Sequence, residues 1–502
     1  MSPRRKKLLL ALGLSAALLV LIGKPLWHIA KTAYYDRPSI EKLPAGYADD
    51  VSRLNKTKIA EEWVIPANAN EAESGLRELL KRAQAQGKHV SIAGARHSMG
   101  AQTIFPDGIL INMLPYKDMQ LDAEKNLLHV QAGAKWADVI PYLDQRGRSI
   151  QVMQSDNSFT VGGSLSVNCH GWQYGRPPIA STVQSIHIIK SDGSVVRASR
   201  TENGELFSLA LGGYGLFGVI MDADLRVVPN ARLRLEQQVV PLDRAMISFE
   251  RKLRERPGVS MVYARLNITP QRMFQEVLLN LFYPEQGSIP PLVSGGNRWL
   301  HRSVFRGSVG NDYGKQLRWS AETTIQPLLG GTVFSRNQLL NDDADWYSDH
   351  SAGTTDILHE YFVPRDGTGP FLNEARRIIL QNKADLLNVT VRELEPDQDT
   401  FLRYADQHIF AFVMFFSQPR TPEGEARMQA ITRELIDAAV KLGGRYYLPY
   451  RLHATVEQFQ RAYPQAGRFF ELKRKYDPSE LFQNQFYVKY GKLEIDQSPV
   501  QH

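Results

Sequence analysis

Apolar and polar residues alternate along the chain in the pattern of short strands separated by amphipathic helices. Between residues 70 and 87 the apolar residues repeat at the spacing of one helix face, with Asn70 placed to cap the helix and Gly87 placed to end it. Asp192-Gly193 stands between two strand-like runs and predicts a hairpin. Strand-like runs lie at 89–94, 109–112, 127–133, 183–191, 194–199 and 217–228, and a further helix is expected near 136–146.

From about residue 232 the pattern changes to longer strands and helices separated by polar loops. One helix is well delimited, because Thr421 can cap it, Pro422 fits its first turn and Gly443 can end it. The segment at 284–315 is rich in Gly, Pro and Ser and is only weakly patterned. We predict a separate α+β domain over residues 232–450.

Positive charge is concentrated at the N-terminus. The formal net charge is +7, but seven basic residues and one acidic residue lie within the first 37 positions, so the rest of the chain is nearly neutral. A nucleic-acid-binding domain would carry a basic stripe of its own. The charge distribution therefore argues against a nucleic-acid partner.

The same N-terminal region has the pattern of a membrane segment. Four cations precede an uncharged apolar stretch, Leu8 to Gly23, and Trp27 follows as an interfacial residue. Sixteen helical residues rise about 24 Å, short of a hydrocarbon core of about 30 Å, which snorkelling lysines can help to match. We predict a membrane anchor or uncleaved signal over residues 1–30 and a polar linker over 31–59; a cleaved secretory signal is the alternative. Both interpretations place the main body outside the cytoplasm, in the periplasm.

Composition is that of an ordinary folded chain of 502 residues, 43% hydrophobic and 23% charged. Cys169 is the single cysteine, so one chain can form neither a disulfide framework nor a cysteine-ligated metal centre. No metal site is expected.

Several familiar motifs are absent or misplaced. Gly213, Gly215 and Gly218 form a literal G-x-G-x-x-G, but a helix-like run precedes it and a strand-like run follows, the reverse of a dinucleotide-binding fingerprint. No H-E-x-x-H, G-x-S-x-G or Walker A pattern occurs. The sequence therefore lacks the motifs that usually indicate a hydrolase, a protease or a nucleotide triphosphatase.

Two other glycine-rich loops can hold an anion. The first, Gly94 to Gly100, directly follows a strand-like run, and the second, Thr160 to Gly171, leads into a turn of small residues. Glycines leave room for backbone amides to approach a phosphate. Two such loops suit a ligand with two phosphates, although a single loop of this pattern is more often structural than functional.

Four segments together resemble the FAD-linked oxidases of the vanillyl-alcohol oxidase and p-cresol methylhydroxylase superfamily. They occur in the family's order and are IAGARHSMGAQ (92–102), TVGGSLSVNCHG (160–171), LFSLALGGYGLFGVI (206–220) and FFELKRKYDPSELFQNQF (469–486). Within the superfamily the details are most similar to aldonolactone and alditol oxidases, cytokinin dehydrogenases and decaprenylphosphoryl-ribose oxidases. The last two groups have a segment similar to GGRYYLPYRLHATVEQF (443–459).

The resemblance implies an α+β, two-domain FAD-binding oxidase fold with a cap domain over the flavin, in addition to the N-terminal membrane helix. Residues 60–231 would form the FAD-binding domain, 232–450 the substrate-binding cap, and 451–502 the return to the FAD domain. The residues implied to contact FAD are Gly94, Ala95, Arg96, His97, Ser98, Thr160, Gly162, Gly163, Ser166, His170, Gly171, Gly218, Ile220 and Asn484.

His97 has a more specific implied role. In many members with a similar loop this histidine is bonded covalently to the flavin, so we expect covalent FAD through His97; the alternative is a histidine that only hydrogen-bonds within its turn. Cys169 does not match the cysteine of bicovalent members, so no second bond is expected.

The resemblance also suggests catalytic candidates, since oxidation at a flavin needs a group that takes the donor's proton. Asp156 lies roughly where cytokinin dehydrogenases have an important aspartate. Tyr450 lies near the position of a lysine in decaprenylphosphoryl-ribose oxidases that this sequence lacks, which leaves the donor open. Tyr447, Arg451 and His453 are further candidates. In the cap, the segment 359–361 (His-Glu-Tyr) and Arg392 can point toward the donor, although such residues more often lie at the surface.

The function predicted from the sequence is an FAD-dependent oxidoreductase acting on a hydroxyl-bearing donor, namely a sugar, polyol, lactone or lipid-linked sugar. Its electrons would pass to oxygen or to a membrane quinone or other carrier. One alternative is an amine dehydrogenase of the cytokinin dehydrogenase type, and another is a tethered binding protein without redox activity.

Overall fold

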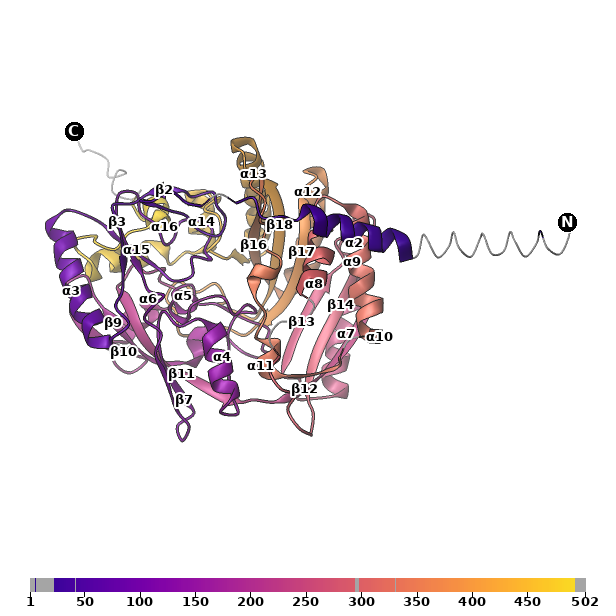
Figure 1. Cartoon of the computed structure of the whole chain (residues 1–502), viewed down its shortest axis with the longest axis horizontal. Coiled ribbons are helices and arrows are strands. Elements are labelled where there is room, and N and C mark those ends of the chain that lie inside the picture. Colours follow the sequence, from indigo (N-terminus) through magenta and orange to yellow (C-terminus); the bar gives the residue numbers. More distant parts are fainter. Residues whose placement is uncertain (1–4, 6–21, 41, 294–297, 330, 493–502) are drawn as a thin grey trace.

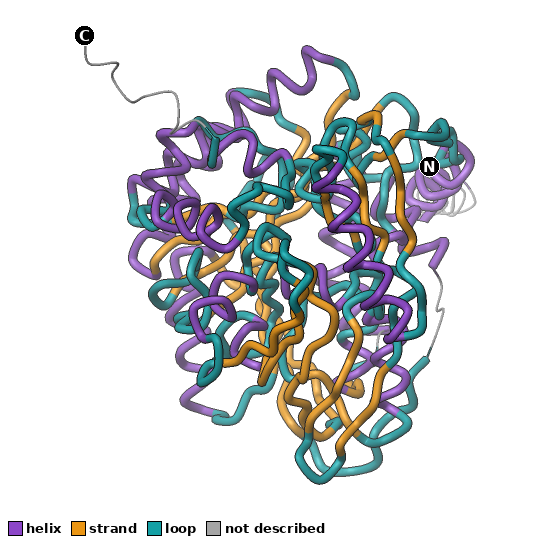
Figure 2. Tube along the Cα trace, turned by 90° about the vertical axis from the view of Figure 1, so that its left-hand side faces the viewer, coloured by secondary structure: helices purple, strands orange, loops and turns teal. Residues whose placement is uncertain are grey.

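The chain folds into two bodies that meet along a cavity. The computed structural model describes residues 5, 22–40, 42–293, 298–329 and 331–492. In Figure 1 the N-terminal strands and the C-terminal helices form one body, and a large antiparallel sheet with its helices forms the other. Figure 2 shows strands through the middle of the molecule with helices on both sides. The fold is therefore of the α+β class.

Three sheets build the first body. A small hairpin joins β1 (Tyr47–Ala48) and β2 (Thr57–Lys58), and a parallel sheet has the order β3-β5-β4. The largest sheet has the order β10-β9-β11-β7-β6, with β8 paired to β11. The strands are β3 (Glu61–Val64), β4 (Val90–Ala93), β5 (Ile109–Asn112), β6 (Met119–Asp122), β7 (Leu127–Gln131), β8 (Arg148–Ile150), β9 (Val183–Ile189), β10 (Val195–Ser199) and β11 (Val219–Pro229).

Helices α3 (Ala69–Ala85), α4 (Trp136–Asp144), α5 (Val161–Ser166) and α6 (Gly204–Ala210) accompany these strands. The apolar face predicted for α3 is buried, and Gly87 adopts the left-handed φ of 62° expected after its end. The cap is Asn68 rather than Asn70, because the Asn68 side chain accepts hydrogen bonds from the backbone N–H groups of residues 70 and 71. The predicted hairpin joins β9 to β10.

The C-terminal tail returns to the first body. Residues 481–483 lie beside β4, where the Val90 N–H donates to the Leu481 carbonyl at 2.8 Å and the Gln483 N–H donates to the Val90 carbonyl at 3.0 Å. The tail carries α14 (Val456–Ala462), α15 (Ala466–Tyr476) and α16 (Gln485–Tyr490), drawn in yellow beside the purple N-terminal elements in Figure 1.

An eight-stranded antiparallel sheet forms the second body, in the order β15-β12-β14-β13-β17-β18-β16-β19. Helices α7 (Leu242–Glu255), α12 (Thr368–Gln381) and α13 (Pro422–Lys441) pack against this sheet. Thr421 caps α13 as predicted, by accepting from the Gly424 N–H. The strands are β12 (Arg232–Pro241), β13 (Met261–Leu266), β14 (Glu276–Pro284), β15 (Val333–Ser335), β16 (Thr354–Pro364), β17 (Asp385–Leu394), β18 (Ile409–Pro419) and β19 (Arg445–Tyr446).

The segment predicted to be weakly patterned is partly helical. It holds α8 (Arg298–Arg306) and the start of α9 (Asp312–Ser320), followed by α10 (Gln326–Leu329) and α11 (Arg336–Leu339). The N-terminal helix α2 (Lys24–Tyr35) packs on α8, where the His28 Nε2 atom lies 2.9 Å from the Gly307 carbonyl oxygen. The segment predicted as a polar linker, 31–59, contains the end of α2 and both strands of the first hairpin.

Within the described residues no helix combines the length and apolarity needed to cross a bilayer. The predicted apolar stretch at 8–23 falls almost wholly on residues outside this description.

Candidate active site

A cavity of about 420 Å³ lies between the two bodies. Its floor comes from both glycine-rich loops and from the start of β11, and its roof from the face of the large sheet that is turned toward the first body. This size lies in the range of about 300–1,000 Å³ that is usual for ligand sites.

The two predicted anion-binding loops are in contact. A Cβ atom added to Gly94 would lie 2.0 Å from the Thr160 Oγ1 atom, so the first loop passes directly over the second. Arg96 has a left-handed φ of 57°, which turns the backbone sharply after the strand. The Ser98 hydroxyl is buried and has no hydrogen-bond partner within the described part of the chain. A glycine-lined turn with an unpartnered buried hydroxyl fits a phosphate group.

Most of the predicted FAD contacts line this cavity. The exceptions are Gly171, which packs so closely that an added Cβ would lie 1.9 Å from the Met153 carbonyl oxygen, and Asn484, which caps α16 and donates to the Tyr214 carbonyl at 2.8 Å. The lining contacts are Gly94, Ala95, Arg96, His97, Ser98, Thr160, Gly162, Gly163, Ser166, His170, Gly218 and Ile220. Gly213, Gly215 and Gly218 lie between α6 and β11, in the helix-then-strand order that excludes a dinucleotide fingerprint.

His97 stands on the cavity wall. Its imidazole stacks on the Phe159 ring with centroids 4.1 Å apart. Both rings line the cavity, and the stacking restrains the plane of the imidazole there. This orientation suits the predicted attachment of a flavin.

A buried group of polar side chains joins the roof to the floor. The Glu360 carboxylate on β16 contacts His170 Nε2 through one oxygen and accepts a hydrogen bond from the Tyr450 hydroxyl at 3.3 Å through the other. The side chains of His170 and Glu360 are each 2% exposed. Burial and the nearby Glu360 carboxylate raise the pKa of Tyr450 well above its ordinary value, so this hydroxyl keeps its proton at neutral pH.

Asp156 also reaches the cavity, where it accepts a hydrogen bond from the Tyr347 hydroxyl. Burial raises the pKa of Asp156. Burial and the Asp156 charge raise the pKa of neighbouring Asp342 to about 7. Two neighbouring buried carboxyl groups therefore hold a proton more readily than exposed carboxyl groups do.

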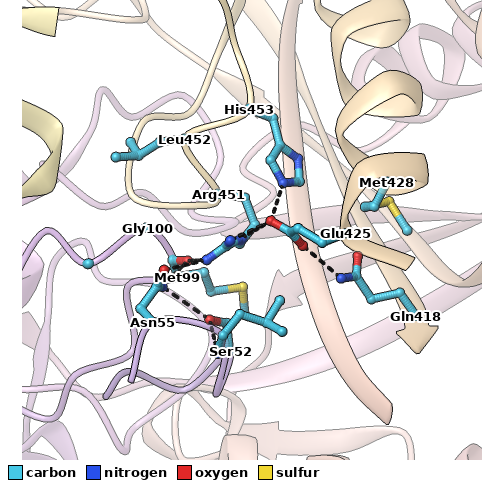
Figure 3. Close-up of polar contacts among 12 residues, drawn as sticks. Ser52, Asn55, Met99, Gly100, Gln418, Glu425, Met428, Arg451, Leu452 and His453 are labelled. Atoms are coloured by element: carbon cyan, nitrogen blue, oxygen red, sulfur yellow. Dashed lines mark hydrogen bonds and ion pairs between the residues drawn. The ribbon is translucent and has the colours of Figure 1, made fainter. Parts of the chain in front are cut away.

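The other three catalytic candidates divide into two groups. Tyr447 lines the cavity, and its hydroxyl donates to the Val167 carbonyl at 2.9 Å. Arg451 and His453 lie outside the lining and bind the Glu425 carboxylate on α13, as Figure 3 shows. Although burial opposes it, the hydrogen bond from His453 and the charge of Arg451 lower the pKa of Glu425 to about 2. The contacts of Arg451 and His453 with Glu425 therefore attach the C-terminal tail to α13.

The sequence did not predict how many side chains of the large sheet line the cavity. Glu360 and Arg392 face the cavity rather than the surface, whereas His359 and Tyr361 point toward the helices, where His359 contacts Thr432. The cavity-facing residues alternate along each strand and are Tyr263 and Arg265 on β13, Leu358 and Glu360 on β16, Asn388, Thr390 and Arg392 on β17, and Val413 and Phe415 on β18. On β17 the polar residues at every second position, Asn388, Thr390 and Arg392, are the signal that finds this face.

Comparisons with known proteins agree with this geometry. Residues 64–199 match the family model described as an FAD binding domain. The chain is 22% identical to L-gulonolactone oxidase from Mus musculus over 426 residues, which covers 82% of this chain and 92% of the relative. It is 24% identical to cytokinin dehydrogenase 10 from Oryza sativa over 78% of each chain, and 25% identical to D-arabinono-1,4-lactone oxidase from Debaryomyces hansenii over 35% of this chain and 34% of the relative.

A glycine-lined cavity roofed by an antiparallel sheet, in a chain with an FAD-binding domain, defines a flavin-dependent oxidoreductase. The FAD-binding-domain match and the similarity to L-gulonolactone oxidase and cytokinin dehydrogenase confirm the resemblance to FAD-linked oxidases and the FAD cofactor predicted from the sequence.

Proposed function

We propose that the protein oxidises a hydroxyl-bearing donor, namely a sugar, polyol, lactone or lipid-linked sugar. Bound FAD would supply the acceptor for the hydride that leaves the donor carbon. The observation that carries the proposal is the buried Glu360 carboxylate in the roof, held by His170 and Tyr450 at the cavity. A carboxylate in that position can take the proton of a donor hydroxyl.

The two bodies of the chain suggest which residues bind FAD and which bind the donor. We propose that residues 60–231 and 451–502 form the FAD-binding domain and that residues 232–450 form the cap that binds the donor. The tail beside β4 and the sheet of β12 to β19 support these boundaries.

A donor panel with a redox dye tests the function. Purified holoenzyme is expected to reduce the dye with sugars, polyols or aldonolactones and to be inactive with N-alkyl amines. Relatives named as lactone oxidases and the Glu360 site favour the first group. Activity confined to N-alkyl amines would establish the alternative amine dehydrogenase, which the buried Asp156 and the cytokinin dehydrogenase relatives favour. Protein without visible flavin absorbance would contradict both.

We further propose that His97 is bonded covalently to FAD. The His97→Ala variant is expected to lose flavin fluorescence from the protein band after acid precipitation and gel electrophoresis, because no other bond would hold the cofactor once the chain unfolds. The matched control is His129→Ala, since His129 lies away from the cavity and binds Asp224 at 3.0 Å. Wild-type protein that releases all its flavin into acid would show that the cofactor is held without a covalent bond.

We also propose a membrane anchor within residues 1–30 and a periplasmic main body. Several large apolar side chains of α2 and of α8, which packs on it, are exposed, including Leu26 (61%), Trp27 (72%) and Trp299 (63%). Tryptophan and leucine of this kind are typical of a surface beside a bilayer. A membrane quinone, oxygen or another carrier would take the electrons, and a lipid-linked donor would reach the site from the same membrane.

Membrane fractionation checks the anchor. The full-length protein is expected to remain with membranes in high salt, and a double Leu14→Lys, Leu18→Lys variant to enter the soluble fraction, because each lysine costs about 2.5–3.5 kcal/mol in a membrane helix. Ser39→Lys adds one lysine outside the apolar stretch and serves as the control. A mature N-terminus beyond residue 30 would instead establish the cleaved signal.

A further inference from the structure

Three arginines stand on or beside the cavity side of the roof. Arg265 lies on β13, Arg392 on β17 and Arg318 on α9, and all three line the cavity. Guanidinium groups are held inside a protein at a high desolvation cost unless a carboxylate or another anion accompanies them.

Arg392 has polar partners but no acidic one. Its NH1 group donates to the His170 carbonyl at 3.3 Å and its NH2 group to the Ser155 hydroxyl at 2.6 Å. Its Nε–H is buried and has no partner in the described chain, and no carboxylate oxygen of the described residues lies within 4.0 Å of the guanidinium. The charge of Arg392 is therefore uncompensated by a direct ion pair.

Arg265 shares its acidic partner. Both Arg265 and Arg318 contact the same Glu322 oxygen, at 3.0 Å and 2.9 Å. Arg318 also donates to the Leu387 carbonyl at 2.7 Å, whereas the Nε–H of Arg265 is buried and unpartnered among the described residues. Two cations with one carboxylate leave a further positive charge at this end of the cavity.

The other acids of the cavity do not neutralise these charges by direct contact. Glu360 is engaged by His170 and Tyr450. Asp156 is engaged by Tyr347, and burial raises the pKa values of both Asp156 and Asp342.

The strand register makes Arg265 and Arg392 diagonal neighbours on adjacent strands of the roof. Arg265 lies directly opposite Thr390 on the neighbouring strand, and Arg392 is two residues further along that strand. Residues in this diagonal relation are about 7–8 Å apart at their backbones, so two long side chains on one face can reach the same group. A carboxylate or a phosphate offers several oxygens to such a pair.

We propose that Arg265 and Arg392 form an anion-binding subsite for a carboxylate or phosphate group of the donor. The inference rests on the proposed function and narrows the donor to an acidic sugar or a sugar phosphate, free or lipid-linked. Glu360 is two strands from Thr390 in the same register, through Val413 on β18, a span of about 10 Å. That span is comparable to a monosaccharide with its acid group at one end and its oxidised hydroxyl at the other.

Titration of the holoenzyme with inorganic sulfate, inorganic phosphate and acetate tests the subsite without turnover. Each anion is expected to change the visible flavin spectrum in a saturable way. Tighter binding of phosphate or sulfate would indicate a phosphate-bearing donor, and tighter binding of acetate a carboxylate-bearing one. The variants Arg265→Gln and Arg392→Gln are each expected to weaken the preferred anion by roughly 10- to 100-fold, as for loss of a charged hydrogen bond. Arg392→Lys keeps the charge and is expected to bind with intermediate strength.

The matched control is Arg234→Gln. Arg234 is also on a strand of the large sheet, but it pairs with Glu285 and lies outside the cavity lining. Its anion affinity is expected to equal that of the wild type. Wild-type holoenzyme with no saturable response, or an Arg392→Lys variant that folds and binds anions no more weakly than wild type, would overturn the subsite. A colourless wild-type protein would instead overturn the proposed function.

Discussion

Replacing Glu360 by glutamine is expected to lower kcat/KM for the donor by about 10²- to 10⁴-fold, the usual contribution of a proton-transferring group. Glutamine keeps the size of the side chain and can still contact Tyr450, but it cannot accept a proton from the donor. Stopped-flow reduction of the flavin by the donor measures the affected step directly. Flavin content is expected to stay at the wild-type level, because the two glycine-rich loops are not altered.

A second glutamate separates this effect from a general loss of charge. Glu374 is exposed on α12 and pairs with Arg377, and a solvent-exposed ion pair of this kind contributes little to stability. The Glu374→Gln variant is therefore expected to match wild-type kcat/KM. If Glu360→Gln reduced its flavin at the wild-type rate, the proton acceptor would have to be sought at Asp156.

Signals from residues close together in the sequence were sufficient to predict individual helices. The helix that became α13 carries its cap, its first-turn proline and its terminal glycine within 23 consecutive residues, 421–443. The contact of Gly94 with Thr160 was predictable only through the family resemblance, because 65 residues lie between these two glycine-loop residues in the chain.

Tertiary contacts account for what the sequence did not predict. Arg451 and His453 are near Tyr450 in the chain, but Glu425 draws both side chains toward α13 and away from the cavity (Figure 3). Glu360 and Arg392, in contrast, face the cavity. Their orientation depends on the register of β16 and β17 against β18. A shift of one residue would have turned both away from the cavity.

The Gly94→Ala variant is expected to lower the free energy of unfolding by about 2–4 kcal/mol and to reduce flavin occupancy. The new Cβ atom would lie 2.0 Å from the Thr160 Oγ1 atom, closer than any van der Waals contact. Thr160 cannot move freely, because its hydroxyl caps α5 by accepting from the Gly163 N–H at 3.2 Å. Overpacking of this kind costs about 1–3 kcal/mol and a disturbed cap about 1 kcal/mol more. Chemical denaturation and flavin absorbance per chain measure the two effects.

Two further variants assign the effect to the contact between the loops. Gly369→Ala on α12 adds the same methyl group where nothing lies within 4 Å, so it is expected to leave stability unchanged or raise it by about 0.5–1 kcal/mol. In a Thr160→Ala background the clashing oxygen is gone, and Gly94→Ala is expected to cost about 1 kcal/mol less than in the wild type. Equal costs in both backgrounds would mean that the two loops do not restrain each other. Partial recovery of flavin in the double variant would show that their close approach shapes the cofactor site.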